Sequence, residues 1–596
     1  MIDFASFPSR EQWQRIGTHK RSGVLVPLFS VHSKNSAGIG DSSDLKLIIK
    51  WARLTGNSII QLLPLNELGG VNCPYDSVSS FALEPAYISL KDIPGFKPAA
   101  LRLNPDPGEF VDYAIRKEKL RILWEIFLPL DLSEAEEFEQ FQKDNVYWLM
   151  DFALFKVLKD LHQGRPWYEW PEEFKSHNRK ALDCFRYEHI EAVTFQMWLQ
   201  WVLFKQFCGV KIEAGKNKVL LKGDLPILVS RDSADVWSHP EFFKLDFASG
   251  APPDMYCAKG QRWGMPTYNW QNIAADSYRY IKEKLKYAEN FYDILRVDHV
   301  VGLFRIWSIP YNEPAENRGL NGTFDPREES LWREHGRNIL DILIKNTKML
   351  LCAEDLGVIP KACPEALKEF GIPGNDVQRW VKDWDKRHDF IPPEEFRELA
   401  VATLSTHDTT NFKAWWQYEA GTVDEGLFVR KCNERGIDFA RVKPELFDLT
   451  RSFHGRLRWK EEVDTVEKLT WILGRKKEDV GDFIDLYLNS YLEKEKLWAL
   501  LGYIKPLEEE ASDELLEKAI KLTLDSKAVF SIHSISDWLG LAGIFEGDPY
   551  RYRINLPGTV SPGNWSLRLP LTLETLLTHA VNKKILAMNR SAKRTV

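Results

Sequence analysis

Residues 294–302 read Ile-Leu-Arg-Val-Asp-His-Val-Val-Gly, a short apolar run that is followed by an acid. The same pattern recurs in Met-Leu-Leu-Cys-Ala-Glu-Asp-Leu-Gly (349–357) and in Val-Ala-Thr-Leu-Ser-Thr-His-Asp (401–408). The three acids are Asp298, Glu354 and Asp408. Each run has the length of a β-strand, and acids at the strand ends of a (β/α)8 barrel meet at one mouth. These stretches therefore predict such a barrel, with three carboxylates converging at its C-terminal face.

Further apolar runs of strand length support a parallel sheet. With the three runs above included, the predicted strands are 23–31, 58–65, 218–229, 294–299, 349–353, 377–380, 401–405 and 528–532. Helical patterns separate several of them. Leu45, Ile48, Ile49 and Ala52, for example, recur at helical spacing on one face of residues 44–54. This alternation favours parallel pairing, and eight strands favour closure. The expected fold class is therefore α/β, a (β/α)8 TIM barrel.

The uneven spacing of the predicted strands locates two long insertions. Both intervals are rich in helical patterns, so we expect largely helical inserted subdomains. The sequence has no internal repeat or low-complexity linker, which favours a single catalytic domain over 1–596. The predicted barrel core covers approximately 20–65, 218–410 and 526–596, and the predicted insertions cover approximately 66–217 and 411–525.

The composition argues against several classes of partner and site. The 596 residues carry a formal net charge of −7 and a pI of about 6.1 without a basic stripe, so nucleic acid and anionic membranes are poor candidate partners. No signal-peptide pattern or apolar run of membrane length occurs. The seven cysteines are scattered without Cys-x-x-Cys spacing. We therefore expect a cytoplasmic protein without a disulfide framework or a zinc site.

Two of the acids suit the retaining cleavage of a glycosidic bond, which uses one carboxylate as nucleophile and a second carboxyl group first as acid and then as base. Asp298 is the predicted nucleophile. Arg296 lies two residues earlier on the same face of its strand and would orient the carboxylate and lower its pKa. Glu354 is the predicted acid/base, because its partly apolar surroundings after Cys352 would raise its pKa.

Asp408 is the predicted stabiliser of the transition state, by accepting hydrogen bonds from sugar hydroxyls near the anomeric centre. His407 and His299 are candidate partners of such hydroxyls. A single aspartate at a strand end is more often a cap or an ion-pair partner, but three acids with such neighbours favour catalysis. The chemistry requires no metal. The sequence has neither a Walker motif nor a dinucleotide-binding glycine motif, so no organic cofactor is expected.

Motifs along most of the chain resemble those of the amylomaltases, or disproportionating enzymes, which are 4-α-glucanotransferases related to the α-amylase superfamily. The resemblance runs from near Ser22 to the C-terminus. In order, the motifs are Gly-Ile-Gly-Asp (38–41), Gln-Leu-Leu-Pro-Leu (61–65), Cys-Pro-Tyr-Asp-Ser-Val-Ser-Ser-Phe-Ala (73–82), Gly-Arg-Pro-Trp-Tyr-Glu-Trp-Pro (164–171), Lys-Gly-Asp-Leu-Pro-Ile (222–227), Asp-Ser-Ala-Asp-Val-Trp (232–237), Gly-Ala-Pro-Pro-Asp (250–254), Gly-Gln-Arg-Trp-Gly (260–264), the three acid motifs, and Asn-Leu-Pro-Gly-Thr with Gly-Asn-Trp (555–565).

The resemblance implies the same roles for the three acids as the residues themselves. It further implies that Arg296, His407 and Asp224 surround the subsite of bond cleavage and that Tyr75 stacks near it. Without the resemblance, Asp224 would equally be a strand-end cap.

Segment 250–264 resembles the mobile loop that covers the bound glucan in that family, which would place Trp263 near the acceptor. Its glycines would permit such motion, although turn formation explains them more simply. Three pairs of residues depart from the pattern common in the family: Met255-Tyr256, Val300-Val301 and Thr409-Thr410. The departures leave the acids intact but leave the preferred acceptor and the product size open.

Transfer and hydrolysis differ in whether a sugar or water attacks the glycosyl-enzyme intermediate. An acceptor held by aromatic rings under a closing loop would exclude water, and the chain has 22 tryptophans. The expected function is therefore transfer of maltosyl or longer α-1,4-glucan units from maltooligosaccharides, starch-derived or glycogen-derived glucans to glucose or another glucan. An α-amylase-type hydrolase and a non-catalytic glucan-binding protein are the alternatives. The sequence does not indicate the oligomeric state.

Overall fold

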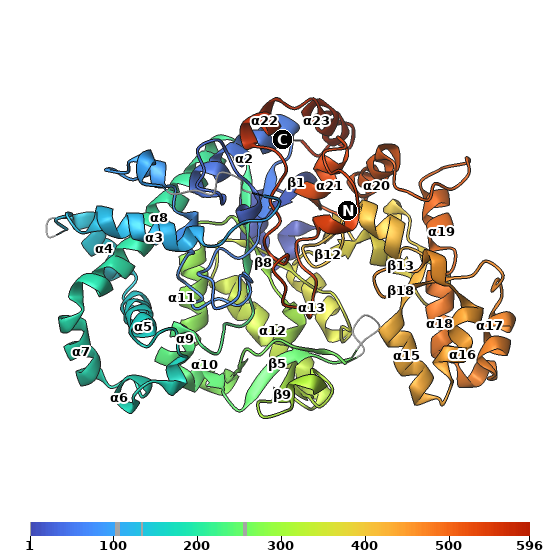
Figure 1. Cartoon of the computed structure of the whole chain (residues 1–596), viewed down its shortest axis with the longest axis horizontal. Coiled ribbons are helices and arrows are strands. Elements are labelled where there is room, and N and C mark those ends of the chain that lie inside the picture. The colour runs from blue at the N-terminus through green and yellow to red at the C-terminus, as the bar shows by residue number, and fades with distance from the viewer. Residues whose placement is uncertain (1, 102–107, 133–134, 254–258, 596) are drawn as a thin grey trace.

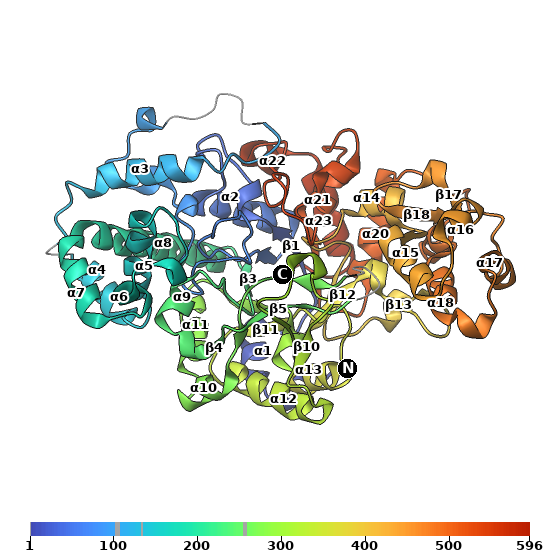
Figure 2. The ribbon, with the colours of Figure 1, turned by 60° about the horizontal axis from the view of Figure 1, so that its bottom comes forward.

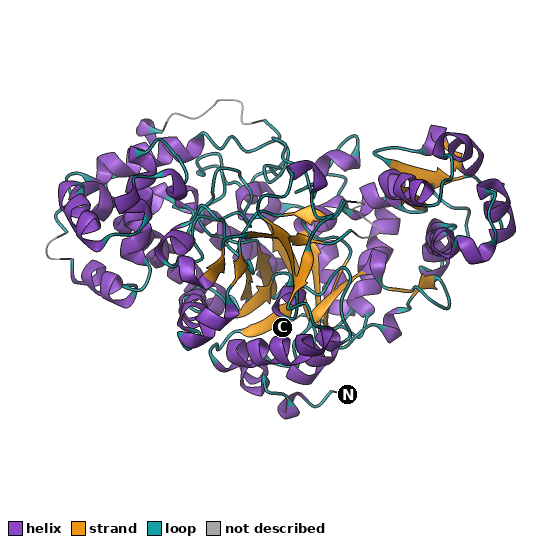
Figure 3. Cartoon of the chain, turned by 90° about the horizontal axis from the view of Figure 1, so that it is seen from below, coloured by secondary structure: helices purple, strands orange, loops and turns teal. Residues whose placement is uncertain are grey.

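The computed structural model describes residues 2–101, 108–132, 135–253 and 259–595. An eight-stranded parallel sheet occupies its centre, with helices around it (Figures 1 and 3). In order of pairing, the strands are β11 (Leu350–Ala353), β8 (Ile294–Val297), β3 (Leu220–Leu225), β2 (Ile59–Leu62), β1 (Arg21–Val26), β19 (Phe530–Ser534), β15 (Ala400–Thr403) and β12 (Gly374–Val377). This arrangement confirms the predicted (β/α)8 barrel.

The barrel closes between β11 and β12. The backbone N–H of Ala353 donates to the carbonyl of Pro373 at 2.7 Å. Side chains complete this seam: the carboxylate of Asp355 accepts from the N–H of Asn375 at 2.6 Å and from Nη1 of Arg397 at 2.6 Å. Arg397 also donates through Nε to Asp376 at 2.8 Å. Polar contacts therefore join the two strands where the backbone ladder is incomplete.

The predicted strand at 377–380 is misplaced. Strand β12 covers Gly374–Val377, and the residues after it form the 3-10 turn η10 (Gln378–Trp380). Only Val377 of the strand is apolar, because the strand meets its neighbour through the polar seam. A prediction from runs of apolar residues therefore places this strand after Val377, whereas it ends there.

Helices cover the outside of the barrel (Figure 3). They are α1 (Arg10–Ile16), α2 (Ser42–Thr55), α11 (Arg279–Ala288), α12 (Glu329–Lys345), α13 (Ala362–Phe370), α20 (Asp513–Asp525), α21 (Ile535–Gly540), α22 (Leu573–Thr578) and α23 (Val581–Ser591). Helix α2 begins with a capping box, in which the side chains of Asp41 and Asp44 each accept a backbone N–H of the other's residue. Its predicted apolar face is fully buried.

Residues between β2 and β3 form a helical layer beside the barrel, at the left of Figure 1. The helices are α3 (Ile115–Phe127), α4 (Glu136–Asp144), α5 (Leu149–Leu161), α6 (Glu172–Lys175), α7 (Arg179–Glu188) and α8 (Ile190–Lys216). Their core is continuous with that of the barrel, since Trp148 contacts the rings of both Phe81 and Tyr287. This part of the chain is therefore packed as an extension of the barrel.

Residues between β15 and β19 extend to the other side of the barrel (Figure 2). They form α14 (Phe412–Ala414), α15 (Glu425–Glu434), α16 (Phe439–Leu446), α17 (Val466–Leu473), α18 (Gly481–Ser490), α19 (Glu493–Leu500) and a small sheet of β16 (Thr422–Asp424), β18 (Arg456–Trp459) and β17 (Phe447–Asp448). The outer part has an apolar cluster of its own that includes Phe428, Trp459 and Phe483. The base of this insertion belongs to the barrel core, through Trp416 and Trp498.

A small antiparallel sheet lies at the lower edge of the barrel in Figure 1. It pairs β10 (Thr323–Asp325), β9 (Ile306–Pro310), β5 (Phe247–Ala251) and β6 (Gln261–Arg262) in that order. Trp263 directly follows β6, and its N–H donates to the carbonyl of Ser249 on β5 at 2.9 Å. The sheet therefore fixes the backbone at Trp263. None of the described helices has the length and apolar character needed to cross a membrane.

Candidate active site

Strands β8 and β11 place two acids side by side. Val297 and Ala353 are register partners at the ends of these strands, so the next residues, Asp298 and Glu354, occupy equivalent positions on strands about 4.8 Å apart. The N–H of Glu354 donates to the carbonyl of Val297 at 3.0 Å. The N–H of His299 donates to Oε2 of Glu354 at 2.9 Å. The backbone thus holds the carboxyl group of Glu354 beside Asp298.

The guanidinium of Arg296 lies between the carboxylates of Asp224 and Asp298. Its Nη1 is 2.8 Å from both carboxylate oxygens of Asp224 and 2.8 Å from Oδ1 of Asp298. Asp224 and Arg296 are register partners on β3 and β8, which explains the contact. The hydroxyl of Tyr75 donates to Oδ2 of Asp224 at 2.7 Å. The guanidinium orients Asp298 and at the same time binds Asp224.

Asp408 follows β15 at the same mouth, and its side chain is about half exposed. Its Oδ2 is 3.3 Å from Nε2 of His407, and its Oδ1 accepts from Nδ2 of Asn555 at 2.7 Å. The ring of His407 stacks on that of Tyr75, with centroids 5.2 Å apart and planes 23° apart. Trp565 completes this aromatic group at 5.8 Å from each ring. Tyr75 therefore connects the Asp408 side of the mouth to Asp224 and Arg296.

The acids have different pKa values because their surroundings differ. Burial raises the pKa of Glu354 to about 7, against the opposing charge of Arg296. This agrees with the prediction for Glu354. The surrounding residues of the mouth desolvate the half-exposed carboxylate of Asp408, which would raise its pKa, but His407 and Asn555 lower that pKa to about 2. At neutral pH, Asp408 is therefore ionised while Glu354 retains a proton for part of the time.

Arg296 lowers the pKa of Asp298 as predicted, but its effect does not determine the net shift. Burial raises the pKa of Asp298 to about 6, although Arg296 lowers it in opposition. The negative charge of Asp224, which binds the same guanidinium, raises it further. One buried cation shared by two carboxylates does not outweigh the loss of hydration.

Trp263 and His299 form a contact on the Glu354 side of the mouth. Their rings meet edge to face with centroids 4.8 Å apart. The indole N–H of Trp263 donates to Oε1 of Gln261 at 3.0 Å, which orients the ring. Burial and the charge of Arg296 lower the pKa of His299 to about 4, so its imidazole is neutral at physiological pH. The structure thus places all the predicted site residues around one mouth.

The sequence matches the 4-alpha-glucanotransferase family model over residues 26–573. The chain belongs to this family. Relatives include the 4-alpha-glucanotransferase of Chlamydia caviae, which is 32% identical over 96% of this chain and 95% of its own length. That of Thermus thermophilus is 32% identical over 66% of this chain and 79% of its own. The predicted family and enzyme class are thereby confirmed.

A solved structure of the Streptococcus agalactiae amylomaltase in complex with acarbose has the same fold. It has a TM-score of 0.71 and 22% identity, and the match covers 97% of this chain and 100% of that one. At this identity the likeness concerns the fold alone. Among the described residues of this protein, no three or more histidine, cysteine or acidic side chains are grouped so that they could hold a metal ion.

Asn555 and Trp565 also lie in the site, although the sequence predicted no role for them. Asn555 holds Asp408, and Trp565 packs on Tyr75 and His407. Both stand in the family-like motif at 555–565, which was the only signal available for them. Asn555 is 147 residues from Asp408, so no local pattern connects the pair.

The residues that depart from the common pattern of the family have structural contacts. Val300 and Val301 are buried. Thr409 accepts from the N–H of Thr406 at 2.9 Å and closes the turn that carries Asp408. Thr410 is fully buried and donates through its hydroxyl to Glu419 at 2.9 Å. The Met255-Tyr256 pair and Asp254 lie outside the described residues.

Proposed function

We propose that this protein is a retaining 4-α-glucanotransferase in which Asp298 is the nucleophile, Glu354 the acid/base and Asp408 the stabiliser of the transition state. The observation that carries the proposal is the pair of neighbouring carboxyl groups directly after β8 and β11, whose pKa values burial raises to about 6 and about 7. Retaining transfer requires one ionised and one protonated carboxyl group side by side. The family match supports the same reaction class.

In the first half-reaction, Asp298 attacks the anomeric carbon of the donor sugar and its Oδ forms a covalent bond there. The glycosidic bond breaks, and Glu354 gives its proton to the leaving oxygen. The carboxyl group of Glu354 is held by the N–H groups of His299 and Leu356 at 2.9 and 3.1 Å, so it keeps its position as its charge changes. The shortened glucan then leaves.

In the second half-reaction, the 4-hydroxyl of glucose or of another glucan attacks the anomeric carbon. Glu354 now accepts the proton of that hydroxyl, and the bond to Asp298 breaks, which regenerates both carboxyl groups. Trp263 lies on the Glu354 side, where the acceptor must approach. Its indole supports an acceptor site there and reduces access of water.

Asp408 and its neighbours hold the sugar ring at the cleaved bond. Asp408 carries a low pKa and stays ionised, so it accepts hydrogen bonds from ring hydroxyls as positive charge develops at the anomeric carbon. Tyr75 and His407 present a stacked pair of rings next to it. The proposed substrates are maltooligosaccharides and α-1,4-glucans. Relatives named 4-alpha-glucanotransferase and a fold relative solved with acarbose support this class.

Incubation with maltotriose tests the proposal. Transfer produces free glucose together with longer maltooligosaccharides while the total of reducing ends stays constant. A steady rise of reducing ends without longer products would show hydrolysis and overturn transfer. The Glu354→Gln variant serves as the matched control, because it keeps the shape of the side chain but has no proton to give. It should lose transfer by a factor of at least 100 and still bind glucan.

A further inference from the structure

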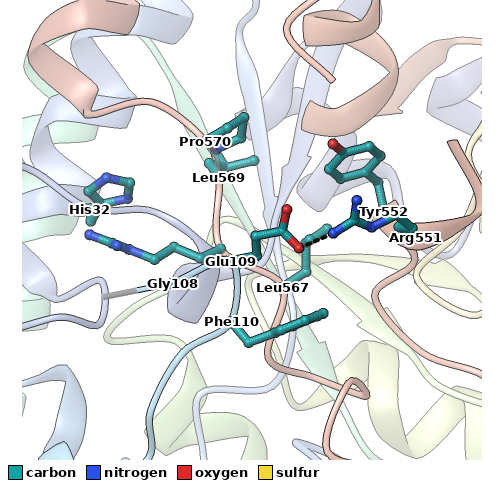
Figure 4. Close-up of a pocket in the computed structure, with 10 residues that line it drawn as sticks. His32, Gly108, Glu109, Phe110, Arg551, Tyr552, Leu567, Leu569 and Pro570 are labelled. Carbon is teal, nitrogen blue, oxygen red and sulfur yellow. Dashed lines mark hydrogen bonds and ion pairs between the residues drawn. The ribbon is translucent and has the colours of Figure 1, made fainter. Parts of the chain in front are cut away.

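A cavity lies outside the active site, next to the segment that supplies Asn555 and Trp565. It has a volume of about 150 Å3 and is shown in Figure 4. Its lining residues come from chain segments on both flanks of 553–566, from the segment before α3 and from the start of the chain. They include His32, Glu109, Phe110, Arg551, Tyr552 and Arg568.

The wall of the cavity is fixed to the active-site segment by backbone hydrogen bonds. The N–H of Arg568 donates to the carbonyl of Glu109 at 2.9 Å, and the N–H of Val111 donates to that of Ser566 at 2.7 Å. Phe110 and Leu567 form an isolated antiparallel bridge between these segments. The wall is therefore preformed, and occupation of the cavity bears directly on the residues that follow Trp565.

Phe110 supplies an apolar platform. Its side chain is 43% exposed, and it lies beside Gly563, where an added Cβ would be 4.0 Å from the ring. An exposed phenylalanine held by backbone pairing in a concave wall is typical of a ligand site rather than of a core. The apolar C–H face of a pyranose ring matches such a surface.

Polar groups around the platform offer both donors and acceptors. Glu109 and Arg551 form an ion pair across the cavity, visible in Figure 4, so their charges balance. The structure gives the side chain of Arg568 no acceptor among the described residues, and its Nε is buried without a partner. His32 is also buried, and its Nδ1 has no partner within the part of the chain that the structure describes. Sugar hydroxyls, which donate and accept, suit this mixture.

We propose that this cavity is an accessory subsite that binds a glucosyl unit of an α-1,4-glucan, separately from the active site. The proposal rests on the proposed function for its ligand class. A neutral sugar suits the cavity better than a phosphorylated one, because Glu109 faces the same space and would repel an anion. Glucan held there keeps donor chains near the mouth and raises their local concentration.

Calorimetric titration of maltotriose tests the subsite in the Glu354→Gln background, where no turnover occurs. The parent should bind two molecules of maltotriose. Phe110→Ala in the same background should weaken the second binding event by about tenfold or more, or abolish it. The matched control is Trp471→Ala, since Trp471 is a 78% exposed aromatic residue on α17 in the outer part of the other insertion and does not line the cavity. The control should retain both events.

Separate outcomes overturn the subsite and the proposed function. The subsite is overturned if only one binding event is seen and Phe110→Ala leaves it unchanged. It is also overturned if inorganic phosphate binds, and this binding persists in Phe110→Ala but is lost in Arg568→Gln. If the wild type fails to disproportionate maltotriose while Phe110→Ala still abolishes a second binding event, the proposed function fails and the subsite stands.

Discussion

At the scale of single residues, the division of one guanidinium between two carboxylates sets the chemistry of the mouth. Arg296 binds Asp224 and Asp298 through the same nitrogen. It therefore orients Asp298 without keeping its pKa low, and burial brings the pKa values of Asp298 and Glu354 close together. Two coupled carboxyl groups of this kind titrate in two steps that belong to the pair.

The first prediction concerns the pH dependence of transfer. Activity requires one ionised and one protonated group in the pair of Asp298 and Glu354, so kcat/KM for maltotriose should be bell-shaped, with its two limbs set by the two titration steps of the pair between about pH 6 and about pH 7. Because the charge of Asp224 raises the pKa of Asp298, Asp224→Asn should move the acid limb to lower pH. Tyr75→Phe removes only a hydrogen bond to Asp224 and should leave the limb in place. If the acid limb of the profile lies at the same pH in the wild type and in Asp224→Asn, this account is contradicted.

The second prediction concerns stability. The pKa of Glu354 is raised from 4.5 to about 7, so folding favours its neutral form. The wild type therefore pays a cost for ionisation that grows from pH 4.5 and is complete above pH 7. Glu354→Gln carries no such cost and should be more stable at pH 8, by roughly 1–3 kcal/mol. Below pH 4.5 this advantage is absent, and the variant should be no more stable than the wild type, because its amide nitrogen cannot accept one of the two backbone N–H groups. Denaturant unfolding at both pH values measures it, and a destabilised variant at pH 8 would exclude the explanation.

At the scale of elements, the closure of the barrel depends on Arg397. Its guanidinium joins Asp355 and Asp376, two buried carboxylates on the two sides of the seam. Asp355 directly follows Glu354, so the seam also supports the acid/base. Arg397 therefore supplements the few backbone contacts of the seam by joining carboxylates from both of its sides.

Loss of this side chain provides the third prediction. Arg397→Met leaves two buried carboxylates without their cation and should lower the free energy of unfolding by roughly 2–4 kcal/mol. Arg387→Met is the matched control, because Arg387 forms only exposed ion pairs with Asp383 and Glu395. It should leave the free energy of unfolding nearly unchanged, because exposed ion pairs contribute little to stability. Similar losses in the two variants, measured by denaturant unfolding, would show that the seam does not depend on Arg397.

The same scale shows what the sequence could reveal. Runs of apolar residues predicted the strands β8 and β11 and the acids after them, because each signal lies within one short segment. Strand β12 pairs with β15 on one side but contains a single apolar residue and was misplaced, since its other side meets polar side chains of distant segments at the seam. Asn555 and Trp565 reach the site through long-range packing, which no periodicity records. Burial likewise reversed the pKa expected for Asp298.

At the scale of the whole molecule, the two insertions relate differently to the barrel. The first shares the barrel core, as the buried Phe152 on α5 illustrates. The outer part of the second has a separate core around Phe428, which contacts the rings of Phe447, Trp459 and Phe483. A part with its own core can open without the rest, provided that its connections to the barrel remain in place.

This difference provides the last prediction. Phe428→Ala removes a fully buried ring from the separate core and should destabilise it locally by about 3–5 kcal/mol. Hydrogen exchange followed by mass spectrometry should then show faster exchange in peptides from 423–491, with little change in those from β8 and β11. Phe152→Ala creates a comparable defect in the shared core, so the barrel strands should also lose protection. If Phe428→Ala accelerated exchange in β8 as strongly as in α15, the separate cluster would not be an independent unit, because its loss would propagate through the base of the insertion at Trp416 and Trp498.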